Sequence, residues 1–274
     1  MARPLHELQV VRTEQVTPHI TRVVLGGNGF EGFDTGVWTD SYAKLIFLPE
    51  GHEGPGPRDI DQAREMQATV RTYTIRSVDA DRREIAIDFV VHGDAGVAGP
   101  WAGRAEPGDK LYVTSPNGAY SPDPAADWHL LAGDEAAVPA ISVALQALPE
   151  HARAKVFIEV AGPQDEIEFD TRGDVDIVWV HRGGGADEVG EEQSGDNAPL
   201  VAAVREADWL PGQVQVFIHG EAQTVMHNLR SYIRKERGVD AKWASSISGY
   251  WRRGRTEESF RVWKQELAAQ ESAS

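Results

Sequence analysis

The chain has 274 residues, which is long enough for one large domain or two ordinary domains with full hydrophobic cores. Its 41% hydrophobic and 26% charged residues are typical of a water-soluble globular protein. The net charge of −16 argues against a general surface for nucleic acid or anionic membranes. No apolar run approaches the ~20 residues that span a bilayer, and the first residues lack a signal-peptide core. We therefore expect a cytoplasmic protein with no nucleic-acid partner and no stable membrane insertion.

The chain contains no cysteine, so disulfides, iron–sulfur clusters, thiolate zinc sites and cysteine nucleophiles are excluded together. Any redox chemistry must then be carried by a bound cofactor. The nine histidines are scattered, and no HExxH motif occurs. We therefore expect no metal site built from protein ligands.

The first ~120 residues are predicted to be short strands separated by turns, with almost no helix. Many short strands of this kind favour a small β-barrel. The strands are predicted at 10–13, 20–25, 43–48, 69–78, 84–91 and 110–115.

The pattern changes near Asp127, where apolar strands begin to alternate with amphipathic helices. This alternation predicts a parallel sheet. A last helix is predicted at 257–269 with Thr256 as its N-cap. We therefore expect two domains, a barrel over residues 1–124 and an α/β domain over residues 125–274. The strands are predicted at 128–132, 155–160, 175–180 and 214–218, and the earlier helices at 137–148, 199–209 and 222–233.

The segment Arg71-Thr72-Tyr73-Thr74 lies inside a predicted strand and alternates Arg, hydroxyl and aromatic residues. Alternate side chains of a strand point to one face. An Arg can form paired hydrogen bonds with a phosphate, and a Tyr ring can lie flat on a planar heterocycle. The segment therefore suits a flavin nucleotide, although Tyr and Thr are also ordinary strand residues.

Three further segments have both a functional and a purely structural interpretation. Gly99-Pro100-Trp101-Ala102 is either a turn whose backbone N–H groups hold a pyrophosphate or a turn with a core Trp. The junction 133–140 follows a strand and opens a helix, which favours anions, but it is neither a Walker loop nor GxGxxG. The segment 249–255, with three Arg and two large aromatics, is either an anion site beside a planar ligand or a solvated turn.

Together these segments resemble the siderophore-interacting protein family of FAD-dependent ferric-siderophore reductases. The likeness covers nearly the whole chain and is strongest to actinobacterial members of the vibriobactin-utilisation type. It rests on the order and spacing of the segments 71–74, 88–93, 99–102, 117–118, 132–140, 219–221 and 249–255. The resemblance implies a ferredoxin–NADP reductase-like fold, in which an antiparallel FAD-binding barrel precedes a parallel-sheet nucleotide-binding domain.

The resemblance also implies roles for individual residues around FAD. Arg71 would hold the FAD phosphates, with Thr72 beside it among the cofactor-binding residues. Tyr73 and Thr74 would be the catalytic pair, one stacked on the isoalloxazine and the other near its reactive N5 edge. The ribityl and adenine side would be lined by Asp88, Val90 and His92, and the pyrophosphate would be held by Gly99, Trp101 and Ala102.

In the second domain, the resemblance places the approach of NAD(P)H at Asp134 and Glu135. Trp251 would flank the flavin. An anionic ferric siderophore would be bound by Arg252, Arg253 and Arg255. The predicted function is reduction of ferric siderophores, with iron released as Fe(II) in the cytoplasm.

The electron donor is predicted to be NAD(P)H, with a reduced ferredoxin as the other candidate. The chain lacks the Gly-Thr-Gly turn and the C-terminal Cys-Gly of ferredoxin–NADP reductases, and Asp134 and Glu135 would repel phosphates. Arg182 is a candidate partner for the 2′-phosphate of NADPH. Two other functions stay open: a siderophore-binding or iron-trafficking flavoprotein without turnover, and a flavin or ferredoxin reductase with another acceptor.

Overall fold

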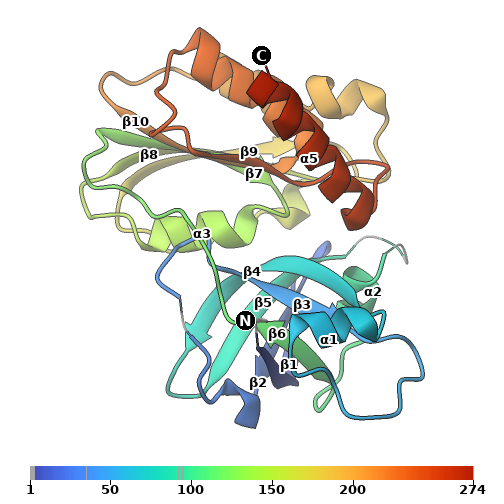
Figure 1. Cartoon of the computed structure of the whole chain (residues 1–274). Coiled ribbons are helices and arrows are strands. Elements are labelled where there is room, and N and C mark those ends of the chain that lie inside the picture. Colours follow the sequence, from blue (N-terminus) through green and yellow to red (C-terminus); the bar gives the residue numbers. More distant parts are fainter. Residues whose placement is uncertain (1–3, 35, 92, 94–95, 274) are drawn as a thin grey trace.

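The chain forms two units, a barrel and a sheet flanked by helices, which lie one above the other in Figure 1. The computed structural model describes residues 4–34, 36–91, 93 and 96–273. Within these residues, no helix combines the length and apolar character needed to cross a membrane.

The barrel is closed by six antiparallel strands in the order β1-β2-β5-β4-β3-β6. The alternation of apolar and polar residues sends one set of side chains inward. Leu8, Val23, Leu45, Ile87 and Phe89 are completely buried in this interior. The antiparallel barrel predicted from the sequence is thus confirmed. Its strands are β1 (Leu5–Thr17), β2 (Ile20–Gly26), β3 (Tyr42–Phe47), β4 (Thr69–Asp79), β5 (Glu84–Val90) and β6 (Lys110–Thr114).

Short helical segments close gaps around the barrel. The first, α1 (Ile60–Glu65), begins at Asp59, whose side chain accepts hydrogen bonds from two backbone N–H groups of the first turn. The second, α2 (Ala98–Arg104), covers the segment for which the sequence predicted a turn. Its small residues Ala98 and Ala102 pack on the barrel interior. A single 3₁₀ turn, η1 (Asn28–Phe30), follows β2.

The second unit is a parallel sheet in the order β11-β10-β7-β8-β9, as predicted. Every residue of the central strand β7 is buried, because helices cover both faces of the sheet. Its strands are β7 (Trp128–Asp134), β8 (Arg153–Val160), β9 (Asp174–His181), β10 (Val214–Glu221) and β11 (Ser246–Trp251).

The strand β11 was not predicted, because Gly249 and the serines of this segment weaken its strand pattern. It nevertheless pairs in parallel with β10 from Phe217 onward. The segment 249–255, for which a solvated turn was one of two interpretations, is therefore divided. Gly249 to Trp251 ends a strand, and only the residues after Trp251 form the turn.

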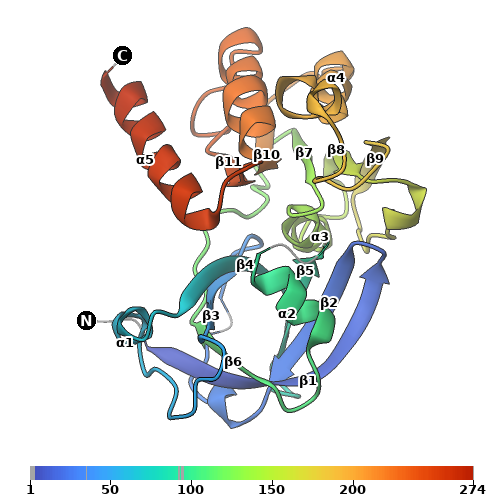
Figure 2. The same cartoon turned by 90° about the vertical axis from the view of Figure 1, so that its right-hand side faces the viewer.

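The helices of the second unit lie on two sides of its sheet (Figures 1 and 2). Helix α3 (Val138–Gln146) lies on the side of the barrel, whereas α4 (Pro199–Glu206) and α5 (Glu257–Ala273) pack on the other face. The helix predicted at 222–233 consists of π-helical turns, η5 (Gln223–Leu229) and η6 (Tyr232–Glu236). Single 3₁₀ turns follow the strands at η2 (Pro163–Asp165), η3 (Glu191–Gln193) and η4 (Gly195–Asn197).

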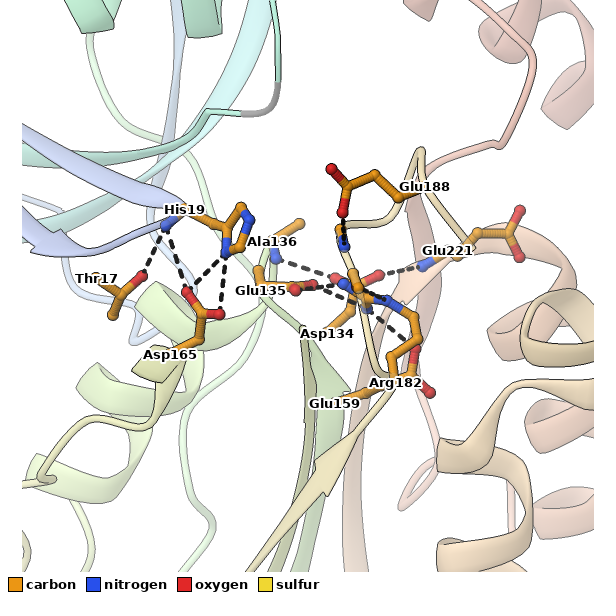
Figure 3. A network of polar contacts seen from close by, with 12 residues as sticks. Thr17, His19, Asp134, Glu135, Ala136, Glu159, Asp165, Arg182, Glu188 and Glu221 are labelled. Atoms are coloured by element: carbon orange, nitrogen blue, oxygen red, sulfur yellow. Dashed lines mark hydrogen bonds and ion pairs between the residues drawn. The ribbon is translucent and has the colours of Figure 1, made fainter. Parts of the chain in front are cut away.

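Polar contacts connect the two units. The backbone N–H of His19, in the turn between β1 and β2, donates to Asp165 of η2 at 3.3 Å. The Nδ1 atom of the same His19 lies 2.9 Å from Asp165 Oδ1 (Figure 3). Elsewhere on the barrel, Arg76 of β4 donates to Gln146 of α3 at 3.4 Å. These contacts hold the rim of the barrel against the second unit.

Gly133, near the end of β7, provides a test of how tightly the strand ends pack. A Cβ atom there would lie 2.4 Å from both Ala137 Cβ and the His219 carbonyl oxygen. We expect Gly133→Ala to lower the free energy of unfolding by about 1–3 kcal/mol, as overpacked cores do. Gly103→Ala is the matched control, because its Cβ would find its nearest neighbour at 3.8 Å. Urea unfolding measures both variants, and a Gly133→Ala protein as stable as the wild type would contradict the packing described.

Candidate functional site

The predicted site strand β4 lies at the junction of the two units, where its side chains meet the start of α5. Arg71 Nη1 lies 2.6 Å from Glu258 Oε1, and Arg71 Nε lies 3.7 Å from Glu257 Oε2. The neighbouring Thr72 Oγ1 donates to Glu257 Oε1 at 3.4 Å. Arg71 otherwise donates to the carbonyl of Val70 in its own strand. Its guanidinium therefore holds anionic groups at this junction, which fits a phosphate-binding role.

The two residues after Thr72 are enclosed at the same junction. The ring of Tyr73 packs against Phe89 with centroids 4.6 Å apart. Burial raises the pKa of the Tyr73 phenol, so it stays neutral at physiological pH. The Thr74 side chain is buried and hydrogen-bonded to the phenol of Tyr250 in β11. Thr74 thus links the barrel to the last strand of the sheet.

The predicted adenine and ribityl residues lie on and after β5. The Asp88 carboxylate is buried and accepts two hydrogen bonds from Arg22, at 2.6 and 2.9 Å. This bidentate pair occupies both oxygens of Asp88 with a side chain of the barrel itself. Val90 is half-buried and pairs with Ile20. His92 lies outside the described residues.

The predicted pyrophosphate segment forms the first turns of α2. The backbone N–H of Trp101 donates to the Val97 carbonyl at 3.1 Å, so this N–H group is already used inside the helix. The Trp101 ring packs edge-on against Phe47 at 5.5 Å, as the alternative interpretation of a core Trp expected. The Ala102 side chain is buried. At Gly99 a Cβ atom would lie 3.0 Å from the Val90 carbonyl oxygen, so glycine permits this close approach.

Asp134 lies at the end of β7 and connects the ends of β7, β10 and β11; Figure 3 shows its contacts with Glu221 and Ala136. Its Oδ2 accepts from the Trp251 indole at 2.7 Å and from the Glu221 N–H at 2.8 Å. Its Oδ1 accepts from the Ala136 N–H at 3.0 Å. Burial, and then repulsion from Glu135, raise the pKa of Asp134 to about 7.

Glu135 forms a buried ion-pair cluster with the next strands (Figure 3). Arg182 Nη2 lies 2.5 Å from Glu135 Oε1, and Arg182 Nη1 lies 3.1 Å from Glu159 Oε1. Burial opposes the charged form of Arg182, but the two carboxylates raise its pKa overall. Arg182 is only 3% exposed. The prediction that it is available to the 2′-phosphate of NADPH is therefore wrong.

Two hollows adjoin these strand ends. The inner one, about 20 Å³, is lined by Asp134, Glu159 and Arg182 and closed by residues 193–195. This volume has room for about one water molecule, not for a nucleotide. The outer one, about 300 Å³, is lined by Arg252 and Arg253 with carboxylates from Glu191, Asp196 and Glu221.

The three Arg residues of the predicted substrate site have different surroundings. Arg252 Nη1 lies 2.9 Å from Glu221 Oε1, and its guanidinium lies over the Trp263 ring at 5.6 Å. Arg253 donates to the Val189 carbonyl at 3.1 Å. Arg255 is exposed to solvent. Arg255 is therefore the most available cation of the three.

The sequence interpretation missed three residues of the junction. Tyr250 was seen only as an aromatic beside glycine, and its contact with Thr74 depends on the parallel pairing of β11. Glu257 and Glu258 were seen only as the start of a helix. Acidic residues in a first helical turn are common for reasons of the helix dipole, so the sequence alone carries no signal of their contact with Arg71.

The arrangement of an antiparallel barrel followed by a parallel sheet is that of ferredoxin–NADP reductase-like flavin reductases. A ferredoxin–NADP reductase from Neisseria gonorrhoeae, solved with bound FAD and NADP, matches with a TM-score of 0.57. It shares 13% identity and covers 84% of this chain and 90% of its own. The predicted fold class is confirmed.

The chain belongs to the siderophore-interacting protein family. The siderophore-interacting FAD-binding domain matches residues 9–120, and the siderophore-interacting protein domain matches residues 126–254. A siderophore utilization protein from T. fusca has the same fold with a TM-score of 0.78 and 33% identity, over 93% of this chain and 96% of its own. The resemblance inferred from the sequence motifs is thus confirmed.

Similar sequences include one uncharacterized protein and two proteins with named activities. An uncharacterized protein of Mycobacterium tuberculosis is 58% identical over 99% of both chains. The ferric vibriobactin reductase ViuB of Vibrio cholerae is 31% identical over 92% of this chain and 91% of its own. An NADPH-dependent ferric-chelate reductase of Escherichia coli is 36% identical over 52% of this chain and 56% of its own. Two of these three relatives are thus named as ferric reductases.

The raised pKa of Asp134 predicts a specific pH dependence of stability. The native state holds a proton on this carboxyl up to about pH 7, whereas the unfolded chain loses it near pH 4. The contribution of this group to the free energy of unfolding therefore falls as the pH rises from about 4 to 7, and it is constant above pH 7. The side chain of the Asp134→Asn variant cannot titrate. Between pH 5 and pH 8, the free energy of unfolding of the wild type should therefore fall by about 1–3 kcal/mol relative to that of the variant.

Urea unfolding at the two pH values measures this difference, with Asp81→Asn as a control in the exposed turn after β4. Parallel pH profiles for the wild type and Asp134→Asn would show that Asp134 stays ionised throughout.

Proposed function

We propose that the protein is an FAD-dependent reductase of ferric siderophores, which releases iron as Fe(II) in the cytoplasm. The observation that carries the proposal is the position of Arg71. It lies in the same strand as Tyr73 and Thr74, faces the junction of barrel and sheet, and already holds carboxylates there. The family match and the activities named for the relatives support the same function.

In this proposal Arg71 binds the FAD phosphates through charge-assisted hydrogen bonds. Tyr73 offers its ring to the isoalloxazine, and Thr74 holds a hydroxyl near the N5 edge, oriented by the Tyr250 phenol. When bound, FAD supplies the redox chemistry and delivers electrons singly to Fe(III). The protein provides position, exclusion of water and fixed charge.

The substrate would approach the turn after β11. Ferric siderophores are often anionic, and a local cation on a protein of net charge −16 attracts an anion to one face. Arg255 is exposed in this turn, whereas Arg252 and Arg253 line the 300 Å³ hollow beside it. Iron leaves after reduction because Fe(II) binds hard oxygen ligands less tightly than Fe(III) does.

The proposed donor is NAD(P)H, bound weakly. The E. coli relative is named for NADPH, and the sheet presents its strand ends as a nucleotide-binding fold does. Against tight binding, Asp134 and Glu135 are buried at those ends and Arg182 is already paired. A reduced ferredoxin is the second candidate donor, because it would not need a phosphate site at these strand ends.

The Arg71 assignment predicts a large change in cofactor affinity. We expect Arg71→Ala to weaken FAD binding by about 1.5–3 kcal/mol, or roughly 10- to 150-fold in Kd, because a charged hydrogen bond is lost. A fluorescence titration with FAD measures it. Arg82→Ala is the control, because this Arg is 70% exposed in the turn after β4. A folded Arg71→Ala protein that binds FAD as tightly as the wild type would refute the assignment.

A reductase with a substrate site should show rates that saturate with ferric siderophore. We expect Arg255→Ala to raise KM several-fold for anionic chelates, with less effect on neutral ones and little effect on kcat. Anaerobic assays with NADH, NADPH and reduced ferredoxin measure KM and kcat and identify the donor. Arg58→Ala, which changes an exposed residue on the barrel, is the control.

Each alternative gives a different result in these assays. Rates linear in chelate and indifferent to Arg255 favour a flavin or ferredoxin reductase with another acceptor. Siderophore binding without reduction favours an iron-trafficking flavoprotein. If only reduced ferredoxin bleaches the FAD absorbance, the nicotinamide proposal fails and the reductase proposal remains.

A further inference from the structure

Helix α5 belongs to the sheet unit but begins at the barrel. Phe260 is 5% exposed and lies in the core of the sheet unit. Trp263 and Leu267 pack against the same core, and Lys264 Nζ donates to Ser248 Oγ at 3.0 Å. In both views the start of α5 lies beside β4 and its C-terminal end points away from the barrel (Figures 1 and 2). The first turn is therefore the part of α5 that reaches across the junction.

This first turn places two carboxylates on the proposed phosphate-binding strand. Glu258 contacts Arg71 at 2.6 Å, and Glu257 contacts both Arg71 and Thr72. A guanidinium has five N–H donors, and carboxylate and phosphate oxygens bind them in the same planar geometry. The carboxylates of α5 thus occupy donors that a flavin phosphate would need.

Electrostatics make carboxylate binding and phosphate binding at Arg71 oppose each other. Burial raises the pKa of Glu257, although Arg71 acts in the other direction, so its charge is only partly compensated. The hydrogen bond from Arg71 lowers the pKa of Glu258. A phosphate on Arg71 would remove the counter-ion of both carboxylates and set a further negative charge in front of them.

We infer that Glu257 and Glu258 form a carboxylate clasp that competes with the FAD phosphates for Arg71. Loading of the cofactor then requires the first turn of α5 to release β4, while Phe260 keeps the rest of the helix on the sheet. FAD is consequently a reversibly bound cofactor, whose affinity is limited by the chain's own carboxylates. This inference rests on the proposed role of Arg71, and it assigns a function to two residues outside the family-matched segments 9–120 and 126–254.

The test compares flavins with and without phosphate. FAD and riboflavin are titrated into the wild type, Glu257→Gln, Glu258→Gln and the double variant, with flavin fluorescence as the readout. The double variant should bind FAD on the order of tenfold more tightly, because two opposing ion pairs are removed. Riboflavin binding should not change, and the gain for FAD should shrink at high salt.

Glu266→Gln is the matched control, because it removes one charge from an exposed position about 14 Å further along the same helix. It should leave the FAD affinity unchanged. Hydrogen exchange supplies a second, direct readout. Added FAD should speed exchange at the amides of Ser259 and Phe260 in the wild type, because both N–H groups donate to Thr256 and the first turn is released.

The outcomes separate the clasp from the proposed function. Unchanged or weaker FAD binding by the double variant would overturn the clasp. An equal gain with riboflavin, or unchanged or slower exchange at Ser259 and Phe260 with FAD, would each overturn it as well. If Arg71→Ala leaves FAD binding unchanged, the phosphate role of Arg71 is rejected first. If Arg71→Ala weakens FAD binding but the Gln variants do not strengthen it, only the clasp is rejected.

Discussion

The hydrogen bond from the Trp251 indole to Asp134 is the interaction on which the site depends. It joins the end of β11 to the end of β7, and the same carboxylate oxygen also accepts from the backbone of Glu221. Because Trp251 is fixed, the turn that follows it has a fixed start, and α5 begins within a few residues. Together with the packing of Phe260 in the core of the sheet unit, this hydrogen bond positions the first turn of α5 at the barrel.

Charge burial also explains why the sheet edge differs from a standard dinucleotide site. The carboxyl groups of three residues lie buried at adjacent strand ends: Asp134, Glu135 and Glu159. Arg182 compensates two of them, and removing one partner of such a cluster leaves an unpaired buried charge. Arg182, the cation that a nucleotide phosphate would use, is thus already held in ion pairs within the fold. Arg255 is exposed in the turn after β11, whereas Arg71 on β4 is paired with Glu257 and Glu258.

The sequence alone predicted most of the architecture, because local periodicity dictates it. Alternating residues in 69–78 and 84–91 identified the barrel hairpin, and the apolar strands with intervening helices identified the parallel sheet. The family motifs, confirmed by the matched domains, pointed to the FAD-binding half. Ser246–Trp251 was missed as a strand because Gly249 and its serines carry a weak pattern, and only pairing with β10 makes it a strand.

The sequence by itself determined the two units, the family, and Arg71 as a cation inside a strand of aromatic and hydroxyl residues. The partners of each charge were decided by the tertiary structure. Arg182 was a candidate for the 2′-phosphate of NADPH but is buried against Glu135. Glu258 looked like an ordinary helix start but lies 2.6 Å from Arg71, 187 positions away. The periodicity of apolar residues is local and can be recognised in the sequence, whereas ion pairs depend on distances that exist only once the chain has folded.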